Sequence, residues 1–132
     1  MSAASNWLEH AVLNHFFRNT PATSPANVFV ALHTTNPTDA DTGIEVTGGA
    51  YARRQINFTA PEQTDGRGTI SNSAEIRFPI ASANWGTITH FSIRTALTGG
   101  NMLAHGAVPT ARIIETGDEA VFRVGSLVVT LD

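Results

Sequence analysis

The chain has 132 residues, the length of one domain with a single hydrophobic core, and its apolar share of 42% is typical of a globular protein. Its charged share is only 14%, against about 25% in most globular proteins, so we expect part of its surface to be covered in an assembly. The net charge of -3 argues against a nucleic-acid-binding protein, and the absence of cysteine excludes disulfides and zinc-thiolate sites.

Residues 6–18 are predicted to form a helix. Apolar side chains recur there at helical spacing, at Trp7, Leu8, Ala11, Val12 and Phe16. Ser5 or Asn6 is a suitable N-cap, and the helix ends before Pro21, because a residue that precedes proline avoids the α conformation. Leu13 and Phe17 widen the apolar surface beyond one stripe, so the helix needs cover on more than one side. Either it packs over an end of a sheet, or part of it docks on a neighbouring subunit.

Residues 21–132 are predicted to form short strands. The seven predicted strands cover residues 28–34, 51–58, 74–78, 87–95, 102–108, 119–124 and 127–131, with turn residues between them. Such short strands, with a turn about every ten residues, are typical of an antiparallel β-sandwich or barrel. The predicted fold is therefore mainly β: an N-terminal α-helix in residues 1–20 and an antiparallel β-sandwich of about seven strands in residues 21–132, forming one domain.

Three histidines raise the question of a metal site. His33, His90 and His105 fall on three predicted strands, and they could meet if these strands were neighbours in register. The chain contains no HxH or HExxH spacing, and isolated histidines bound to other side chains are far more common. We therefore predict no metal at these residues.

The first loop carries three carboxylates, Asp39, Asp41 and Glu45. Alternating carboxylates resemble a calcium site, but the loop lacks the ligand count and order of an EF-hand. Aspartate and threonine also stabilise turns by accepting hydrogen bonds from nearby backbone N–H groups. We favour turn-forming carboxylates, with a weak cation site as the alternative.

Motifs of several other function classes are absent from the chain. No stretch approaches the ~20 apolar residues of a membrane span, and the N-terminus lacks the pattern of a signal peptide. No GxGxxG or GK[ST] loop is present to bind a nucleotide, and Ser71 and Ser73 lack a GxSxG elbow. We therefore expect a soluble protein without catalytic residues or a cofactor.

Two aromatic residues are candidates for stacking on a sugar. Tyr51 begins a predicted strand and Trp85 lies in a predicted turn, so both could be exposed. A carbohydrate site needs rings gathered on one face, whereas rings at these positions more commonly fill the ends of a sandwich. A host polysaccharide site at Tyr51 and Trp85 is therefore a weak alternative.

The order of several motifs resembles a family of small phage proteins known as tail fibre or minor tail proteins. These motifs extend from Leu8 to Asp132, and they are VALHTTNPTDADTG, EVTGGAYARR, SNSAEIRFP, NWGTITHFSI, GGNMLAHGAV and GDEAVFRVGSLVVTLD. The resemblance implies a non-enzymatic structural protein of the virion, made in the cytoplasm of the bacterial host, on the tail or the collar. A capsid decoration protein and a receptor-binding module for host polysaccharide are the alternatives.

The resemblance also implies partners. It predicts contacts with other phage virion proteins and a homo-oligomer, either a trimer or a higher ring. The acidic net charge and the lack of a long apolar stretch predict neither a nucleic acid nor a membrane as a partner. We expect the helix to supply the assembly interface, with the apolar residues Trp7, Leu8, Val12, Leu13, Phe16 and Phe17.

Overall fold

Antiparallel strands dominate residues 2–132, the part of the chain that the computed structural model describes. The described residues form ten strands in three sheets and one helix, α1 (Asn6–Phe17), which confirms the predicted mainly β class. The strands are β1 (Ser2–Ala4), β2 (Val28–His33), β3 (Arg54–Ile56), β4 (Glu62–Thr64), β5 (Arg67–Ser71), β6 (Ile76–Arg77), β7 (Gly86–Arg94), β8 (Met102–Ile114), β9 (Val121–Phe122) and β10 (Val128–Leu131).

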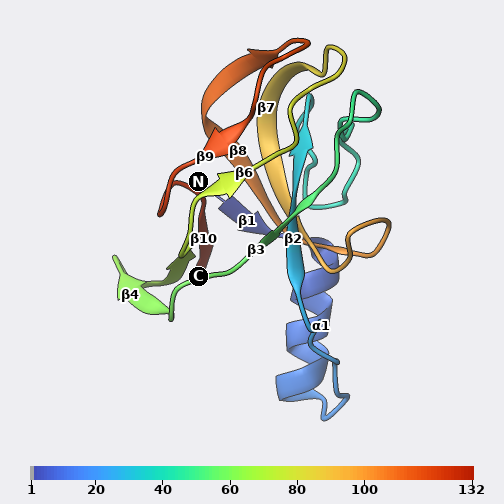
Figure 1. Cartoon of the computed structure of the whole chain (residues 1–132). Helices are drawn as coiled ribbons and strands as arrows, with labels where there is room; N and C mark the ends of the chain where they lie inside the picture. Colours follow the sequence, from blue (N-terminus) through green and yellow to red (C-terminus); the bar gives the residue numbers. More distant parts are fainter. Residues whose placement is uncertain (1) are drawn as a thin grey trace.

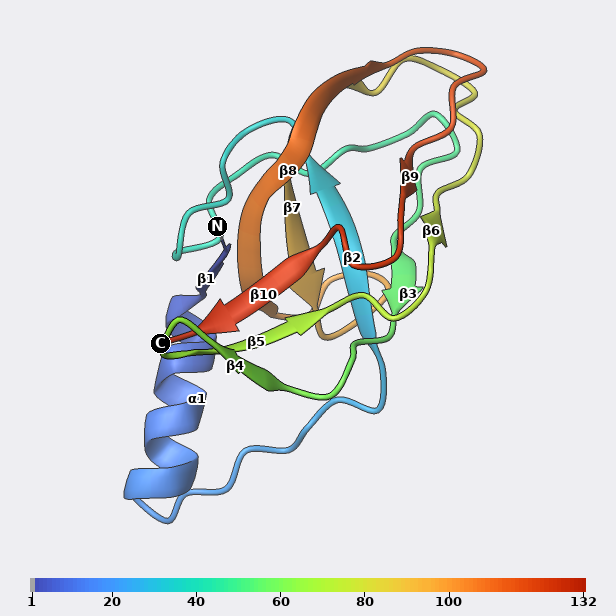
Figure 2. The same ribbon diagram turned by 90° about the vertical axis from the view of Figure 1, so that its left-hand side faces the viewer.

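The sheets lie in two layers (Figures 1 and 2). The five-stranded sheet, with the order β1-β8-β7-β2-β3, forms one layer. The three-stranded sheet β10-β5-β4 and the two-stranded sheet β6-β9 form the other. The core between them includes Val30, Leu32, Phe91, Ile93, Ile76, Phe78, Phe122 and Leu127. This arrangement is the predicted antiparallel β-sandwich.

The five-stranded sheet is buried on both faces around β2. Successive side chains of a strand point to opposite faces, so Val30 and Leu32 enter the core while Ala31 and His33 point the other way. All four are nevertheless buried. The loop of residues 34–53 covers this second face, and side chains of the loop pair with side chains of β7 and β8.

Several predicted strands differ from those observed. The predictions for β2, β7 and β10 agree with the structure to within one residue at each end, whereas β8 extends six residues further, to Ile114. Three strands were not predicted. β1 precedes the helix and pairs with residues 104–106 of β8, so the N-terminal segment also contributes to the sheet. β4 and β5 form a hairpin in a region that the prediction assigned partly to a turn.

The β4–β5 hairpin depends on a tight turn at Asp65 and Gly66. Thr64 pairs with Arg67, so the loop has two residues, and both have positive φ angles, 52° and 77°. These angles are typical of the primed turns that connect two antiparallel strands, and an Asp-Gly pair is a strong signal for such a turn. β4 was not predicted because its sequence, Glu-Gln-Thr, is polar throughout and shows no alternation of apolar and polar residues.

Candidate functional site

Helix α1 starts inside the fold and then projects away from it (Figures 1 and 2). Ser5 is the N-cap, since its Oγ accepts a hydrogen bond from the Leu8 N–H at 3.0 Å. The same Oγ donates to the buried carbonyl of Met102, and the Ser5 N–H donates to the Leu103 carbonyl. The Asn6 N–H donates to the Asp39 carbonyl at 2.9 Å. The first turn of α1 is therefore held by β8 and by the loop.

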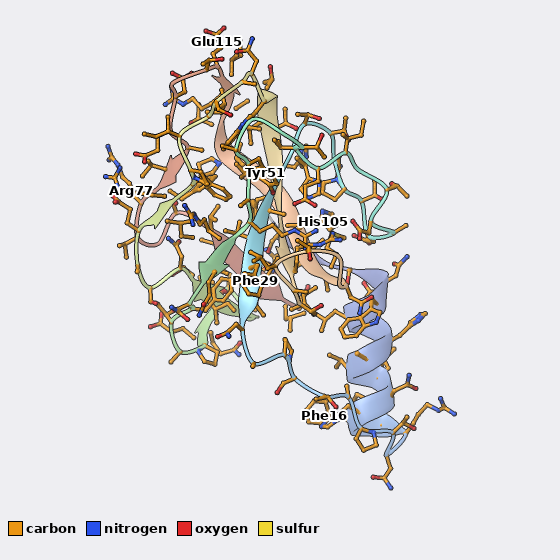
Figure 3. All side chains as sticks on the ribbon, turned by 45° about the vertical axis from the view of Figure 1, so that its right-hand side comes forward. Phe16, Phe29, Tyr51, Arg77, His105 and Glu115 are labelled. Carbon is orange, nitrogen blue, oxygen red and sulfur yellow. The ribbon has the colours of Figure 1, made fainter. Side chains whose placement is uncertain are left out.

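The rest of α1 is largely uncovered. None of its 12 residues is buried, and its large apolar side chains are exposed: Trp7 to 40%, Leu13 to 53%, Phe16 to 75% and Phe17 to 78%. Figure 3 shows Phe16 near the far end of the helix, away from the sheets. A 12-residue helix is marginally stable in water without packing, so the chain presents apolar surface that its own fold does not cover. At this length, α1 is also too short to cross a membrane.

The predicted interface residues of α1 fall into two sets. Trp7, Leu8, Val12 and Phe16 line a groove of about 420 Å³ between the helix and the returning segment 22–25. The Ala22 N–H donates to His15 Nδ1 at 3.0 Å and holds this segment beside the helix. Leu13 and Phe17 do not line the groove and face solvent. Segment 22–25 was not predicted to belong to this surface, since its small residues and prolines give no periodic signal.

Each carboxylate of the loop pairs with a different basic side chain. Asp39 Oδ1 lies 2.8 Å from His105 Nε2, and Asp41 Oδ1 accepts a hydrogen bond from Arg94 Nη1 at 2.7 Å. Glu45 accepts two hydrogen bonds from Arg53, at 2.8 and 2.9 Å. The prediction of turn-forming carboxylates is thus wrong, because each carboxylate accepts a hydrogen bond from a basic side chain, on β8, on β7 or later in the loop, and not from a nearby backbone N–H group. The three carboxylates do not converge, and residues 2–132 contain no cluster with metal-binding geometry.

Glu45 is the centre of a half-buried polar network. It accepts a hydrogen bond from the Tyr51 hydroxyl at 2.7 Å, and that hydroxyl accepts one from the Leu32 N–H at 3.0 Å. Arg53 also donates to the carbonyls of Ala96 and Gly99, both at 2.8 Å. The network therefore connects the loop to β2 and to the β7–β8 turn.

The pKa values reflect this network. Burial would raise the pKa of Glu45, but hydrogen bonds from Arg53 and Tyr51 outweigh burial and hold the pKa below its ordinary value. Burial and the hydrogen bond to Glu45 raise the pKa of Tyr51, so its hydroxyl remains a donor. A charged Glu45 and a neutral Tyr51 are the states that satisfy every hydrogen bond of the network.

The three histidines lie on adjacent strands but have separate partners. His33 is directly opposite His90 across β2 and β7, and His105 is opposite Ser92 across β7 and β8. His33 Nε2 lies 2.8 Å from Ser92 Oγ, and His90 Nδ1 lies 2.8 Å from the Thr89 hydroxyl. Since His105 is paired with Asp39, the side chains do not point at a common centre.

Tyr51 and Trp85 pack in and against the core, as the favoured interpretation expected, and the exposed pair of rings that the weak polysaccharide alternative requires is not present. Trp85 is buried, and Tyr51 packs against it edge to face with ring centroids 5.4 Å apart. The indole Nε1 donates to the Gly49 carbonyl at 2.8 Å, and the Tyr51 ring stacks on Phe78. These rings belong to the core, and neither presents a face on which a sugar could stack.

Together these features define a β-rich structural domain whose buried polar groups hold its own loops and whose helix offers apolar contact surface. Residues 3–130 match the model of a family described as Podophage GP4 fiber I protein gp80. The chain therefore belongs to this family of phage fibre proteins, which confirms the resemblance found in its sequence motifs. No curated protein matches the chain.

Proposed function

We propose that this chain is a non-enzymatic structural subunit of a phage particle and that it assembles with other virion proteins through α1. Membership of a phage fibre family supports the structural role. The observation that carries the proposal is the exposure of Leu13, Phe16 and Phe17, each more than half exposed on a helix with no buried residue. Full burial of such a side chain contributes about 1.5–3 kcal/mol, so a partner that covers all three gains a substantial part of a specific contact.

The contacts of the loop carboxylates fix the position at which α1 starts. Asp39 holds His105 through its side chain and the Asn6 N–H through its carbonyl, so one residue links β8, the loop and the start of the helix. Arg94 and Arg53 fix the rest of the loop through Asp41 and Glu45. Because the helix starts from a fixed point, its apolar residues have a defined direction before they meet a partner, which lowers the entropic cost of binding.

The test replaces Leu13 and Phe17 by serine and measures the mass of the purified chain by light scattering. We expect the double variant to lose subunit association or to incorporate poorly into particles, while its circular dichroism stays that of a folded protein. The matched control is Ile80→Ser with Leu97→Ser, which removes two apolar side chains of comparable exposure, 61% and 52%, outside α1.

Serine could also weaken the helix itself, so a second variant, L13Q/F17Q, keeps good helix-forming residues while removing the apolar surface. If both double variants remain folded and associate like the wild-type chain, α1 is not the assembly surface. Electron microscopy of intact particles then shows whether the subunit occupies the tail, the collar or the capsid surface, and with what symmetry.

A further inference from the structure

A groove of about 660 Å³ lies between β8 and the segment 118–126. Buried apolar residues of the core line it, among them Leu32, Ile88 and Phe122. Figure 2 shows the upper half of β8 on one side of this region and β9 on the other. The groove is separate from α1 and from the side chains of Glu45, Tyr51 and Arg53, none of which lines it. Leu32, whose backbone N–H donates to Tyr51, is the one residue that this groove shares with the network around Glu45.

Both strands beside the groove have edges without a strand partner in residues 2–132. β1 covers only residues 104–106 of β8, and β9 pairs only with β6. In addition, Ile88 pairs with Arg112 whereas His90 pairs with Ala107, so residues 108–111 bulge out of the β7–β8 ladder. Open strand edges are sites at which a further chain segment can pair.

The groove also offers positive charge without an acidic partner. Arg112 and Arg123 line it, both are exposed, and neither side chain makes a hydrogen bond or ion pair within residues 2–132. Two carboxylates also line the groove, and both have other partners: Glu119 binds Arg77 at 2.6 Å, and Asp118 accepts a hydrogen bond from the Glu115 N–H at 2.8 Å.

A buried hydroxyl group of the groove also lacks a hydrogen-bond partner. Ser126 Oγ lines the groove and has no hydrogen-bond partner among the described residues. Buried polar groups are normally paired, so an unpaired hydroxyl in the same groove as two unpaired guanidinium groups favours an acidic ligand with hydrogen-bonding groups of its own.

The same chain carries a complementary element. β4 is the edge strand of its sheet, all three of its residues are exposed, and Figures 1 and 2 show it away from the upper half of β8. Glu62 on β4 and Asp65 in the turn have no charged partner within residues 2–132. The two-residue turn makes this hairpin narrow.

We propose that the β4–β5 hairpin of one copy docks in the β8–β9 groove of a second copy, with Glu62 and Asp65 facing Arg112 and Arg123. This inference rests on the proposed role as an assembling subunit and names one of its contacts. Because the two surfaces differ, the contact is head-to-tail, and repetition of it produces a closed ring or an extended filament. The charges set the register and the partner more than the strength of the contact.

The test uses two charge reversals in the full chain, R112E/R123E and E62R/D65R, with sedimentation measured at physiological salt. Each variant alone places like charges together, and we expect self-association to weaken about tenfold or more. An equimolar mixture restores opposite charges at both contacts, so we expect it to regain wild-type association. The quadruple variant, with all four reversals in one chain, is expected to regain it as well.

Arg67 provides the matched control. It is on the same hairpin, and R67E makes the hairpin more acidic, so association is expected to be unchanged or stronger. The proposal is overturned if the reversed variants associate like the wild-type chain, or if the mixture fails to rescue folded variants. It is also overturned if the wild-type chain stays monomeric at about 1 mM, the weak limit of a specific contact. The L13S/F17S variant tests α1 separately, so failure of one contact is distinguishable from failure of the other.

Discussion

His33 is a polar residue enclosed at the end of β2. Its Nε2 lies 2.8 Å from Ser92 Oγ, while Nδ1 has no partner within residues 2–132. Burial lowers the pKa of His33 to about 4, against an ordinary value of 6.5, although Glu45 opposes this shift. The residue is therefore neutral in the folded protein at pH 7, and the fold has no acidic side chain hydrogen-bonded to it when it is charged.

This burial predicts that the folded chain loses stability as the pH falls. Between pH 6.5 and 4 the unfolded chain binds a proton at His33 that the folded chain does not, so the free energy of unfolding decreases. From pH 7 to pH 5 we expect a loss of about 2 kcal/mol from this residue, measured by urea unfolding at each pH. Glu45 adds a loss in the same direction only below its ordinary value of 4.5.

The matched variants are His33→Gln, which cannot titrate, and His10→Gln on the exposed surface of α1. We expect His33→Gln to flatten the pH dependence and His10→Gln to leave it intact. An equal slope in the wild-type chain and in His33→Gln would mean that other groups cause the acid sensitivity.

At the scale of the element, the start of α1 depends on one hydroxyl. Ser5 Oγ caps the helix through the Leu8 N–H and also satisfies the Met102 carbonyl in the core. Ser5 and Asn6 were both suitable caps from the sequence alone, and the structure places Asn6 in the first turn with an exposed side chain.

We therefore expect Ser5→Ala to reduce the free energy of unfolding by about 1–3 kcal/mol, since it removes the cap and leaves a buried carbonyl unpaired. Urea unfolding and helical ellipticity measure the effect. Asn6→Ala is the control, and its effect is expected to stay within about 0.5 kcal/mol. Comparable losses in both variants would contradict the assignment of Ser5 as the cap.

At the scale of the whole molecule, the chain combines a well-packed sandwich with a projecting helix. The sandwich buries Leu32, Phe78 and Leu127 almost completely, whereas α1 buries none of its residues. Local stability follows local packing, so the helix is expected to open more easily than the central strands of the isolated subunit.

This difference predicts a specific pattern of amide hydrogen exchange. In the isolated chain we expect fast exchange in α1 after its first turn and slow exchange in β7, which lies between β8 and β2. After incorporation into particles, exchange in α1 should slow by about tenfold or more, while exchange in β7 stays nearly unchanged. Equal rates for α1 in both states would show that no partner covers the helix.

Local chemistry made part of this structure predictable. The spacing of Trp7, Leu8 and Val12 predicted α1, because helical periodicity is a property of neighbouring residues. The apolar patterns of β2 and β7 predicted two central strands of the sandwich for the same reason. β4 was missed because its three polar residues carry no alternation, and β1 because three residues are too few to show one.

The candidate site was predictable to a smaller extent. The apolar residues of α1 were identified from the sequence, but the groove beside the helix includes Pro25, Val28 and Leu103, which only folding brings together. The partners of Asp39, Asp41 and Glu45 depend on the registers of β7 and β8 and on the path of the loop. No local pattern encodes such distances along the chain.

The amino-acid sequence by itself determined the fibre family, the mainly β class and the apolar helix, because motifs, alternation and periodicity are local. The tertiary structure alone decided that Trp85 is buried, that each loop carboxylate pairs with one basic side chain, and that α1 remains uncovered. It also decided that Arg112 and Arg123 line one groove. These properties depend on which surfaces meet after the sheets pack, and burial and charge pairing exist only once distant residues are neighbours.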